Sequence, residues 1–294
     1  MKRIFFLSIA LLISFSGAFA NNGSGYNIRV KLDNYPQNQL VLGFYYGDKT
    51  YVKDTVDLGA DGYFTFTADT LLPCGVYLLV TKPDNNFIQF MLPADAQRFT
   101  ISTDMKDMVN KMKFKGSDDN DRFYDYLRFL GKMRPEADTL RAQLNRLKSN
   151  VADSIRISDK LADIDKQVKK LQADIIGKNP GSMTAKVIKA AMEPEPPQFT
   201  GDEKEIGLKR DYWYKAHFFD NIDIADPCML HGPVLHSKID QYISKVTPQH
   251  PDSINISIDY LLSKMNNSNE NFKYYLIHFL NQYAKSNIVG MDAC

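Results

Sequence analysis

The stretch that decides the fold is Met112-Lys-Phe-Lys-Gly-Ser-Asp-Asp-Asn120, because the spacing of apolar residues changes across it. Before it, apolar residues recur at every second position, as in half-buried strands; after it they recur at every third or fourth, as in helices. Gly116 is expected to end the last strand and Ser117 to cap the helix that follows. The first turn of that helix holds Asp118, Asp119 and Asp121. The helix dipole favours negative charge there, so an all-β region is predicted to give way to an all-α region at this point.

The predicted fold is of the α+β class, with the two kinds of structure in separate domains. Residues 26–116 are expected to form an antiparallel β-sandwich of about eight short strands. Alternation such as Ile28, Val30 and Leu32 indicates strands, and Gly47-Asp48 indicates a turn between two of them. No helical pattern interrupts this region, which favours antiparallel pairing.

Residues 117–294 are expected to form a helical domain that contains a coiled helical hairpin. Apolar residues follow spacings of three and four in two stripes, which are out of register. Continuing the first stripe would place serines on the seam in place of Ile157. We therefore favour an antiparallel hairpin over one long helix, with a break near Ser149-Asn150 and Asp153 capping the second arm. Further helices are expected to follow a cap at Ser182 and to lie around residues 204–219, 233–246, 253–265 and 269–285.

Residues 1–20 have the order of a secretory signal peptide. Lys2 and Arg3 precede an apolar run, and Ala18 and Ala20 supply the small-residue pattern of a cleavage site. The run is shorter than the roughly 20 apolar residues that a membrane-spanning helix needs. We therefore expect cleavage after Ala20 and an exported protein in the periplasm or cell envelope.

The charge balance excludes several kinds of partner. The leader carries two of the 36 basic residues and none of the 35 acidic ones, so the net charge falls from +1 to −1 on cleavage. A near-neutral chain offers no basic field for nucleic acid and no polybasic membrane patch. After cleavage, no other segment is long and apolar enough to be predicted to span a membrane.

The chain has three cysteines, Cys74, Cys228 and Cys294. An odd, sparse set does not form a disulfide framework, and no C-x-x-C pair is present for dithiol redox chemistry. A bridge between Cys74 and Cys228 is one arrangement, but unpaired thiols are the favoured interpretation.

One cluster has metal-ligand residue types. Cys228-x-x-His231-x4-His236, with His217 earlier in the chain, resembles half a zinc site, but the second close pair is missing. Solvated histidines are the favoured alternative, so no metal and no cofactor are predicted. Cys228 beside a histidine also has the residue types of a thiol nucleophile, but no orienting acid follows from the spacing, and no catalytic residue is assigned.

Tyrosines gather in the strands around residue 46. Tyr45, Tyr46 and Tyr51 are the candidate binding surface, for a glycan or a peptide. Aromatic residues are common on packed sheet faces, and that interpretation is favoured over a binding platform.

Several of these segments resemble one family. Gly43-Phe-Tyr-Tyr-Gly-Asp-Lys-Thr-Tyr51, Asp61-Gly62, Gly75-Val-Tyr77 and Phe114-Lys-Gly-Ser117 resemble the N-terminal β-domain (domain of unknown function 4369) of exported, thioredoxin-like TlpA-type disulfide oxidoreductases of Bacteroidetes. The helical domain of unknown function 5106 that follows it is similar to His217-Phe-Phe-Asp-Asn221, Pro233-Val-Leu235 and Thr247-Pro-Gln-His-Pro-Asp-Ser253.

The resemblance implies a periplasmic redox protein whose C-terminal thioredoxin fold holds a C-x-x-C pair. This sequence reaches Cys294 before any such pair, so we expect a truncated member, and a chain that ends naturally at Cys294 is the alternative. The expected function is a non-catalytic binding or docking module for an unknown envelope protein or peptide, with a second copy of the chain as a further candidate partner. The alternative function is a stand-alone envelope protein that binds glycan or peptide. An enzyme built around Cys228 is the third hypothesis.

Overall fold

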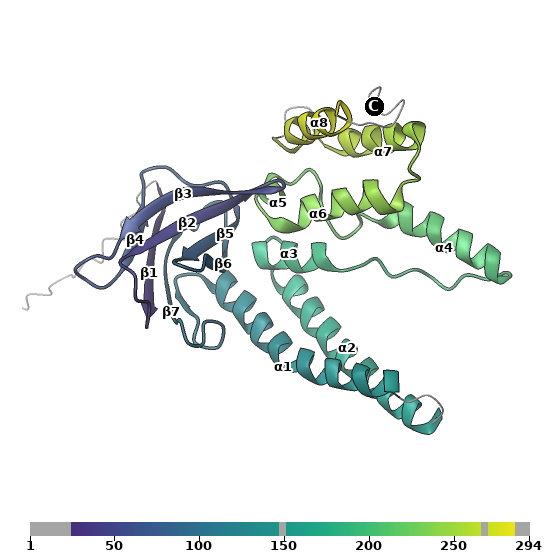
Figure 1. Cartoon of the computed structure of the whole chain (residues 1–294), viewed down its shortest axis with the longest axis horizontal. Helices are drawn as coiled ribbons and strands as arrows, with labels where there is room; N and C mark the ends of the chain where they lie inside the picture. Colours follow the sequence, from purple (N-terminus) through teal and green to yellow (C-terminus); the bar gives the residue numbers. More distant parts are fainter. Residues whose placement is uncertain (1–24, 147–150, 266–269, 286–294) are drawn as a thin grey trace, which may run out of the picture.

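The structure of the protein is a computed structural model that describes residues 25–146, 151–265 and 270–285. A β-sandwich occupies one end of the molecule, and the helices extend from it in two arms and a packed group (Figure 1). The α+β class with a sandwich before the helices is confirmed. The predicted leader over residues 1–20 lies outside the described residues.

The sandwich has two four-stranded sheets, of order β4-β1-β7-β8 and β3-β2-β5-β6. The strands are β1 (Asn27–Asp33), β2 (Gln39–Tyr46), β3 (Lys49–Asp57), β4 (Phe64–Thr67), β5 (Gly75–Thr81), β6 (Asn86–Leu92), β7 (Arg98–Asp104) and β8 (Lys113–Lys115). All neighbours pair antiparallel except β1 and β7, which run parallel. The expectation of purely antiparallel pairing was therefore wrong at this one place. A parallel pair needs a long crossover, and the chain supplies one because it builds strands β2 to β6 before returning beside β1.

The two sheets enclose a core of apolar side chains at alternate strand positions. Ile28 and Val30 of β1 face Leu40 and Leu42 of β2 in one hydrophobic cluster, and all four are fully buried. Alternation places the intervening residues of β1 toward solvent. The apolar residues at every second position therefore give each sheet one apolar face, and the two apolar faces pack together as the core of the sandwich.

Helix α1 (Asp118–Arg146) begins where the sequence predicts it. Gly116 has a φ of +93°, a conformation that glycine adopts without steric cost, and it turns the chain out of β8. The fully buried Asn120 then accepts a hydrogen bond from Met91 N at 2.6 Å and donates one to Met91 O at 2.7 Å. Its amide thus pairs with the open edge of β6 as a neighbouring strand would, and it fixes α1 on the sandwich.

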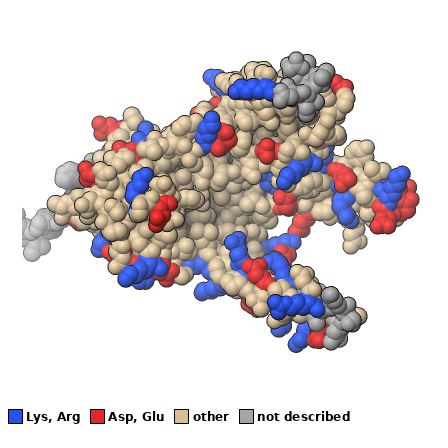
Figure 2. All heavy atoms as spheres, in the orientation of Figure 1, with Lys and Arg blue, Asp and Glu red and all other residues tan. Residues whose placement is uncertain are grey.

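Helices α1 and α2 (Val151–Lys178) form the predicted hairpin, and the expected break falls on residues 147–150, outside the described ones. Leu140 of α1 packs with Ile157 and Ile164 of α2 in a small core of their own. Asp153 lies in the first turn of α2 and pairs with Arg156 at 3.1 Å. Its predicted capping role was wrong, because α2 already begins two residues earlier. Basic and acidic side chains are mixed along this arm, as expected for a solvated surface (Figure 2).

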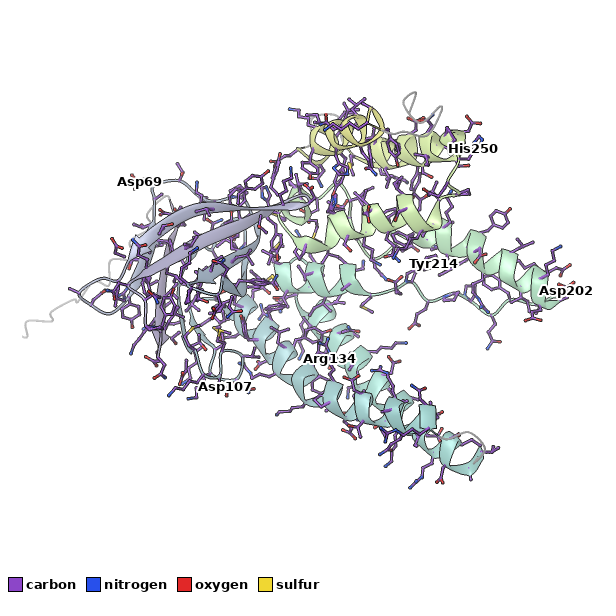
Figure 3. The ribbon with its side chains drawn as sticks, in the orientation of Figure 1. Asp69, Asp107, Arg134, Asp202, Tyr214 and His250 are labelled. Atoms are coloured by element: carbon purple, nitrogen blue, oxygen red, sulfur yellow. A yellow bond between two sulfur atoms is a disulfide. The ribbon has the colours of Figure 1, made fainter. Side chains whose placement is uncertain are left out.

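The remaining helices lie between the α1–α2 arm and the top of the view in Figure 1, and one of them extends away from the sandwich as a second arm. They are α3 (Met183–Ala191), α4 (Glu203–His217), α5 (Pro227–Leu230), α6 (Pro233–Gln241), a π-helical turn η1 (Tyr242–Val246), α7 (Pro251–Lys264) and α8 (Glu270–Tyr283). Ser182 caps α3 as predicted. Asp202 caps α4 at the end of that helix that lies farthest from the sandwich (Figure 3). The short α5 was not predicted, because four residues are too few to show a period. None of the described helices is long and apolar enough to cross a membrane.

A disulfide joins the sandwich to the helices. Cys74, just before β5, is bonded to Cys228 of α5, with Cα atoms 4.8 Å apart. The favoured expectation of unpaired thiols was therefore wrong. The two residues are 154 positions apart in sequence, and only the docking of α5 on the start of β5 brings them within bonding distance. Beside the disulfide, Val76 N donates to His231 O at 2.7 Å, which continues the attachment.

Candidate functional site

The end of the β2–β3 hairpin and helix α8 form an open hollow of about 500 Å³. This volume is within the range of roughly 300–1,000 Å³ that small-molecule sites occupy. Three aromatic rings contribute to its walls: Tyr46 and Tyr51 from the hairpin, and Tyr274 from α8. The other lining residues are Asp48, Lys49, Lys273, Ile277, His278, Asn281 and Gln282.

A glycine at the tip of the hairpin makes this geometry achievable. Gly47 has a φ of +60°, and a β-carbon there would overlap the ring of Tyr274. Its N–H donates to Leu230 O at 3.0 Å, so the turn is held against α5 while it rests on α8. The Gly47-Asp48 turn predicted from sequence is confirmed, and it is also the contact between the sandwich and the last helix.

Asp48 and Tyr274 connect the two sides of the hollow through reciprocal hydrogen bonds. The Tyr274 hydroxyl donates to Asp48 Oδ1 at 2.7 Å and accepts from Asp48 N at 3.0 Å. Burial acts to raise the pKa of Asp48, but the Tyr274 hydrogen bond and the nearby His236 and Lys49 outweigh it, and the net pKa is lowered. Burial raises the pKa of Tyr274 to about 12. At neutral pH Asp48 is therefore an ionised carboxylate that accepts a hydrogen bond from the protonated hydroxyl of Tyr274.

Helix α8 also places a histidine on the hollow, one turn after Tyr274. His278 stacks beside Tyr274 with ring centroids 6.0 Å apart and meets the ring of His236 at 5.0 Å. Burial, and then the neighbouring His236, lower the pKa of His278 below its ordinary value. The imidazole is therefore neutral at pH 7 and offers one donor and one acceptor nitrogen.

The candidate binding tyrosines are only partly brought together. Tyr46 and Tyr51 both line the hollow, whereas Tyr45 points to the other face of β2, where its hydroxyl accepts from Gln89 Nε2 at 2.9 Å. Residues that follow one another in a strand alternate between its faces, so Tyr45 and Tyr46 could not have formed one surface. Tyr274 and His278 were not identified from sequence. Their spacing of four in a predicted helix, beside its apolar stripe, was the available signal.

The residues of the metal-like cluster lie in different surroundings. Cys228 is in the disulfide, and the half-buried His217 contacts Asp220 at 2.6 Å. His231 is only 3% exposed and packs against the rings of Phe44 and Tyr46, so the favoured alternative of solvated histidines was wrong for this residue. Residues 25–146, 151–265 and 270–285 contain no group of three or more histidine, cysteine or acidic side chains that could hold a metal ion.

Two family models match the chain. Residues 26–123 match a domain of unknown function (DUF4369), and residues 171–289 match another domain of unknown function (DUF5106). The first match covers the sandwich and the start of α1, and the second runs from the end of α2 through α8. These are the two domains that the sequence resembles, and their presence is confirmed. Comparison with curated proteins and with solved structures found no match.

Proposed function

We propose that the chain is an exported, non-catalytic binding module and that the hollow between the β2–β3 hairpin and α8 is its binding site. The observation that carries the proposal is the composition of this hollow. Its walls combine exposed or half-buried aromatic rings with hydrogen-bonding side chains around an opening to solvent. A small number of polar groups that converge on an aromatic surface is typical of ligand sites.

Two features support export. Residues 1–20 have the pattern of a secretory leader. The disulfide between Cys74 and Cys228 is of a kind that persists in oxidising compartments and is rare in the cytosol. The cross-link fits an envelope protein whose sandwich and helices act as one body.

The family resemblance supports a setting for this module. The two matched domains follow one another along the chain, and the resemblance noted from sequence implies the same order in TlpA-type thioredoxin-like oxidoreductases of Bacteroidetes. We propose that the module docks an envelope protein or peptide for such a redox partner. The second candidate is a stand-alone envelope protein that binds glycan or peptide, and the aromatic lining of the hollow favours it. Both candidates place the ligand in the same hollow.

A binding experiment tests the proposal. The full chain is purified from the envelope fraction and titrated calorimetrically with short oligosaccharides and with a peptide digest of a denatured protein. We expect saturable binding to at least one of these probes. Tyr274→Ala should abolish it, because this change removes a wall of the hollow and the partner of Asp48. The matched control is Tyr212→Ala on α4, where the side chain is 74% exposed. Absence of binding to every probe, or equal binding by both variants, would refute the proposal.

A further inference from the structure

We propose that the ligand of the hollow is a neutral, hydroxyl-rich molecule, namely a short segment of uncharged glycan. This inference rests on the proposed binding site, and it selects the glycan ligand of the second candidate function over the protein or peptide ligand of the first. A sugar ring has one face of C–H bonds and an edge of hydroxyl groups, so it is complementary to a site that offers flat aromatic surface and planar polar groups together.

The aromatic surface is available in the form that a sugar ring needs. The side chain of Tyr51 is 47% exposed and lies beside Phe44, with ring centroids 5.7 Å apart. Tyr46 and Tyr274 meet edge to face at 5.2 Å, so their rings present two surfaces at a steep angle. A ligand in the hollow therefore meets rings that come from the hairpin and from α8.

The polar groups lie around these rings and are suited to hydroxyl partners. Asn281 and Gln282 are exposed side-chain amides at the rim, each with donors and an acceptor. Burial and then His236 lower the pKa of His278 although its side-chain contact with Gln282 acts the other way, and the neutral imidazole has one donor and one acceptor nitrogen. Asp48 uses Oδ1 to accept from Tyr274, and no hydrogen bond to its second oxygen is found among the described residues. Hydroxyl groups, which donate and accept, can satisfy all of these side chains at once.

A second polar layer lies directly behind the walls. Tyr275 is completely buried and its ring meets that of Tyr274 at 5.0 Å, while His236 meets His278 at the same distance. Within the described residues, the Tyr275 hydroxyl and His236 Nδ1 have no hydrogen-bond partner although both atoms are buried. Buried polar atoms are normally paired, so this layer behind the walls holds hydrogen-bonding capacity that the described residues do not use.

The charges of the hollow argue against an ionic ligand. Its lining contains one carboxylate, Asp48, and two ammonium groups, Lys49 and Lys273. An anionic ligand would meet the Asp48 carboxylate beside the rings, and a cationic one would meet both lysines. The lining therefore carries a net charge of only +1 with both signs present, so a ligand of either charge meets a like charge, which favours an uncharged ligand.

The neighbouring sheet edge argues against an extended peptide. Strand β3 lies at the end of its sheet and would be the strand to which a peptide adds. Its exposed residues include Lys49 and Lys53, and charged side chains on an edge discourage strand addition. The edge of β3 is therefore protected against the addition of a peptide strand, whereas the aromatic hollow beside it is open.

The test compares ligand classes on the full chain. Calorimetric titrations use neutral oligosaccharides of glucose, mannose, galactose, xylose and N-acetylglucosamine, with polygalacturonate as an anionic glycan and a peptide digest as the alternative. We expect saturable binding to at least one neutral oligosaccharide. Tyr51→Ala should weaken it about tenfold, the loss of one stacking contact, and Gln282→Ala should weaken it by a smaller factor. Both side chains are exposed, so folding is preserved, which circular dichroism checks, and Tyr212→Ala again serves as the control.

The outcomes separate this inference from the proposed function. Binding of peptides in the hollow without any neutral oligosaccharide would overturn the glycan class and leave the binding module intact. Tighter binding of polygalacturonate than of every neutral oligosaccharide would overturn the argument from charge. No binding of any probe, or oligosaccharide binding that is unchanged in both hollow variants, would overturn the inference and the proposed site together.

Discussion

Removal of the disulfide should destabilise the whole described fold, and this prediction can be worked out from the structure. The change is the double substitution Cys74→Ser with Cys228→Ser, and reduction of the wild-type protein is the equivalent treatment without substitution. The disulfide is the covalent link between β5 and α5, next to the backbone hydrogen bond from Val76 to His231. We expect both treatments to lower the free energy of unfolding by the same amount.

The magnitude follows from the loop that the disulfide closes. The two cysteines are 154 residues apart. For a loop of that length, the loss of chain entropy in the unfolded state corresponds to about 5 kcal/mol at 25 °C. Residual structure in the unfolded chain reduces this figure, and measured values for native disulfides favour a loss of about 2–4 kcal/mol.

The assay is equilibrium unfolding in urea, followed by circular dichroism and by the fluorescence of Trp213, the single tryptophan. Cys294→Ser is the control, because it removes the third cysteine and leaves the disulfide in place, so the midpoint should be unchanged. Alkylation of Cys74 and Cys228 in unreduced, unfolded protein would show that the cross-link does not form. An unchanged midpoint in the double variant would refute the argument from loop entropy, and a loss well above 5 kcal/mol would show that the cysteines contribute mainly through native packing.

Three further predictions concern other parts of the molecule. Asn120→Ala should lower the free energy of unfolding by about 2–4 kcal/mol, since Met91 N and O would lose their buried partner, whereas Asn110→Ala on the surface should change it little in the same urea assay. Because burial lowers the pKa of His278, the unfolded chain binds a proton at higher pH than the folded one, and the free energy of unfolding should fall as the pH drops below about 6.5. His278→Gln should reduce this loss between pH 7.5 and 5.5, and the same pH dependence in both proteins would contradict the assignment. N-terminal sequencing of protein from the envelope fraction should begin at Asn21, and a chain that retains its first residue there would contradict the predicted leader.

Sequence determined the class of fold because the decisive signals are local. Apolar residues recur at every second position up to Phe114 and at every third or fourth position after Ser117. The first spacing indicates segments that can bury one face as strands, and the second indicates segments that can do so as helices. The caps have the same character, since Ser182 acts on a backbone group only three residues away. The hairpin of α1 and α2 was equally readable, because its two apolar stripes are adjacent in the chain.

Tertiary structure alone decided the pairing of distant groups. The parallel neighbours β1 and β7, and the bond between Cys74 and Cys228, depend on how complete elements dock. The candidate site has the same origin: Tyr51 was identified from its strand, but Tyr274 reaches it from more than two hundred positions away, through the Asp48 contact. Periodicity tells which face of an element is apolar and carries no information about which other element will cover it, so the hollow exists only once α8 has packed against the hairpin.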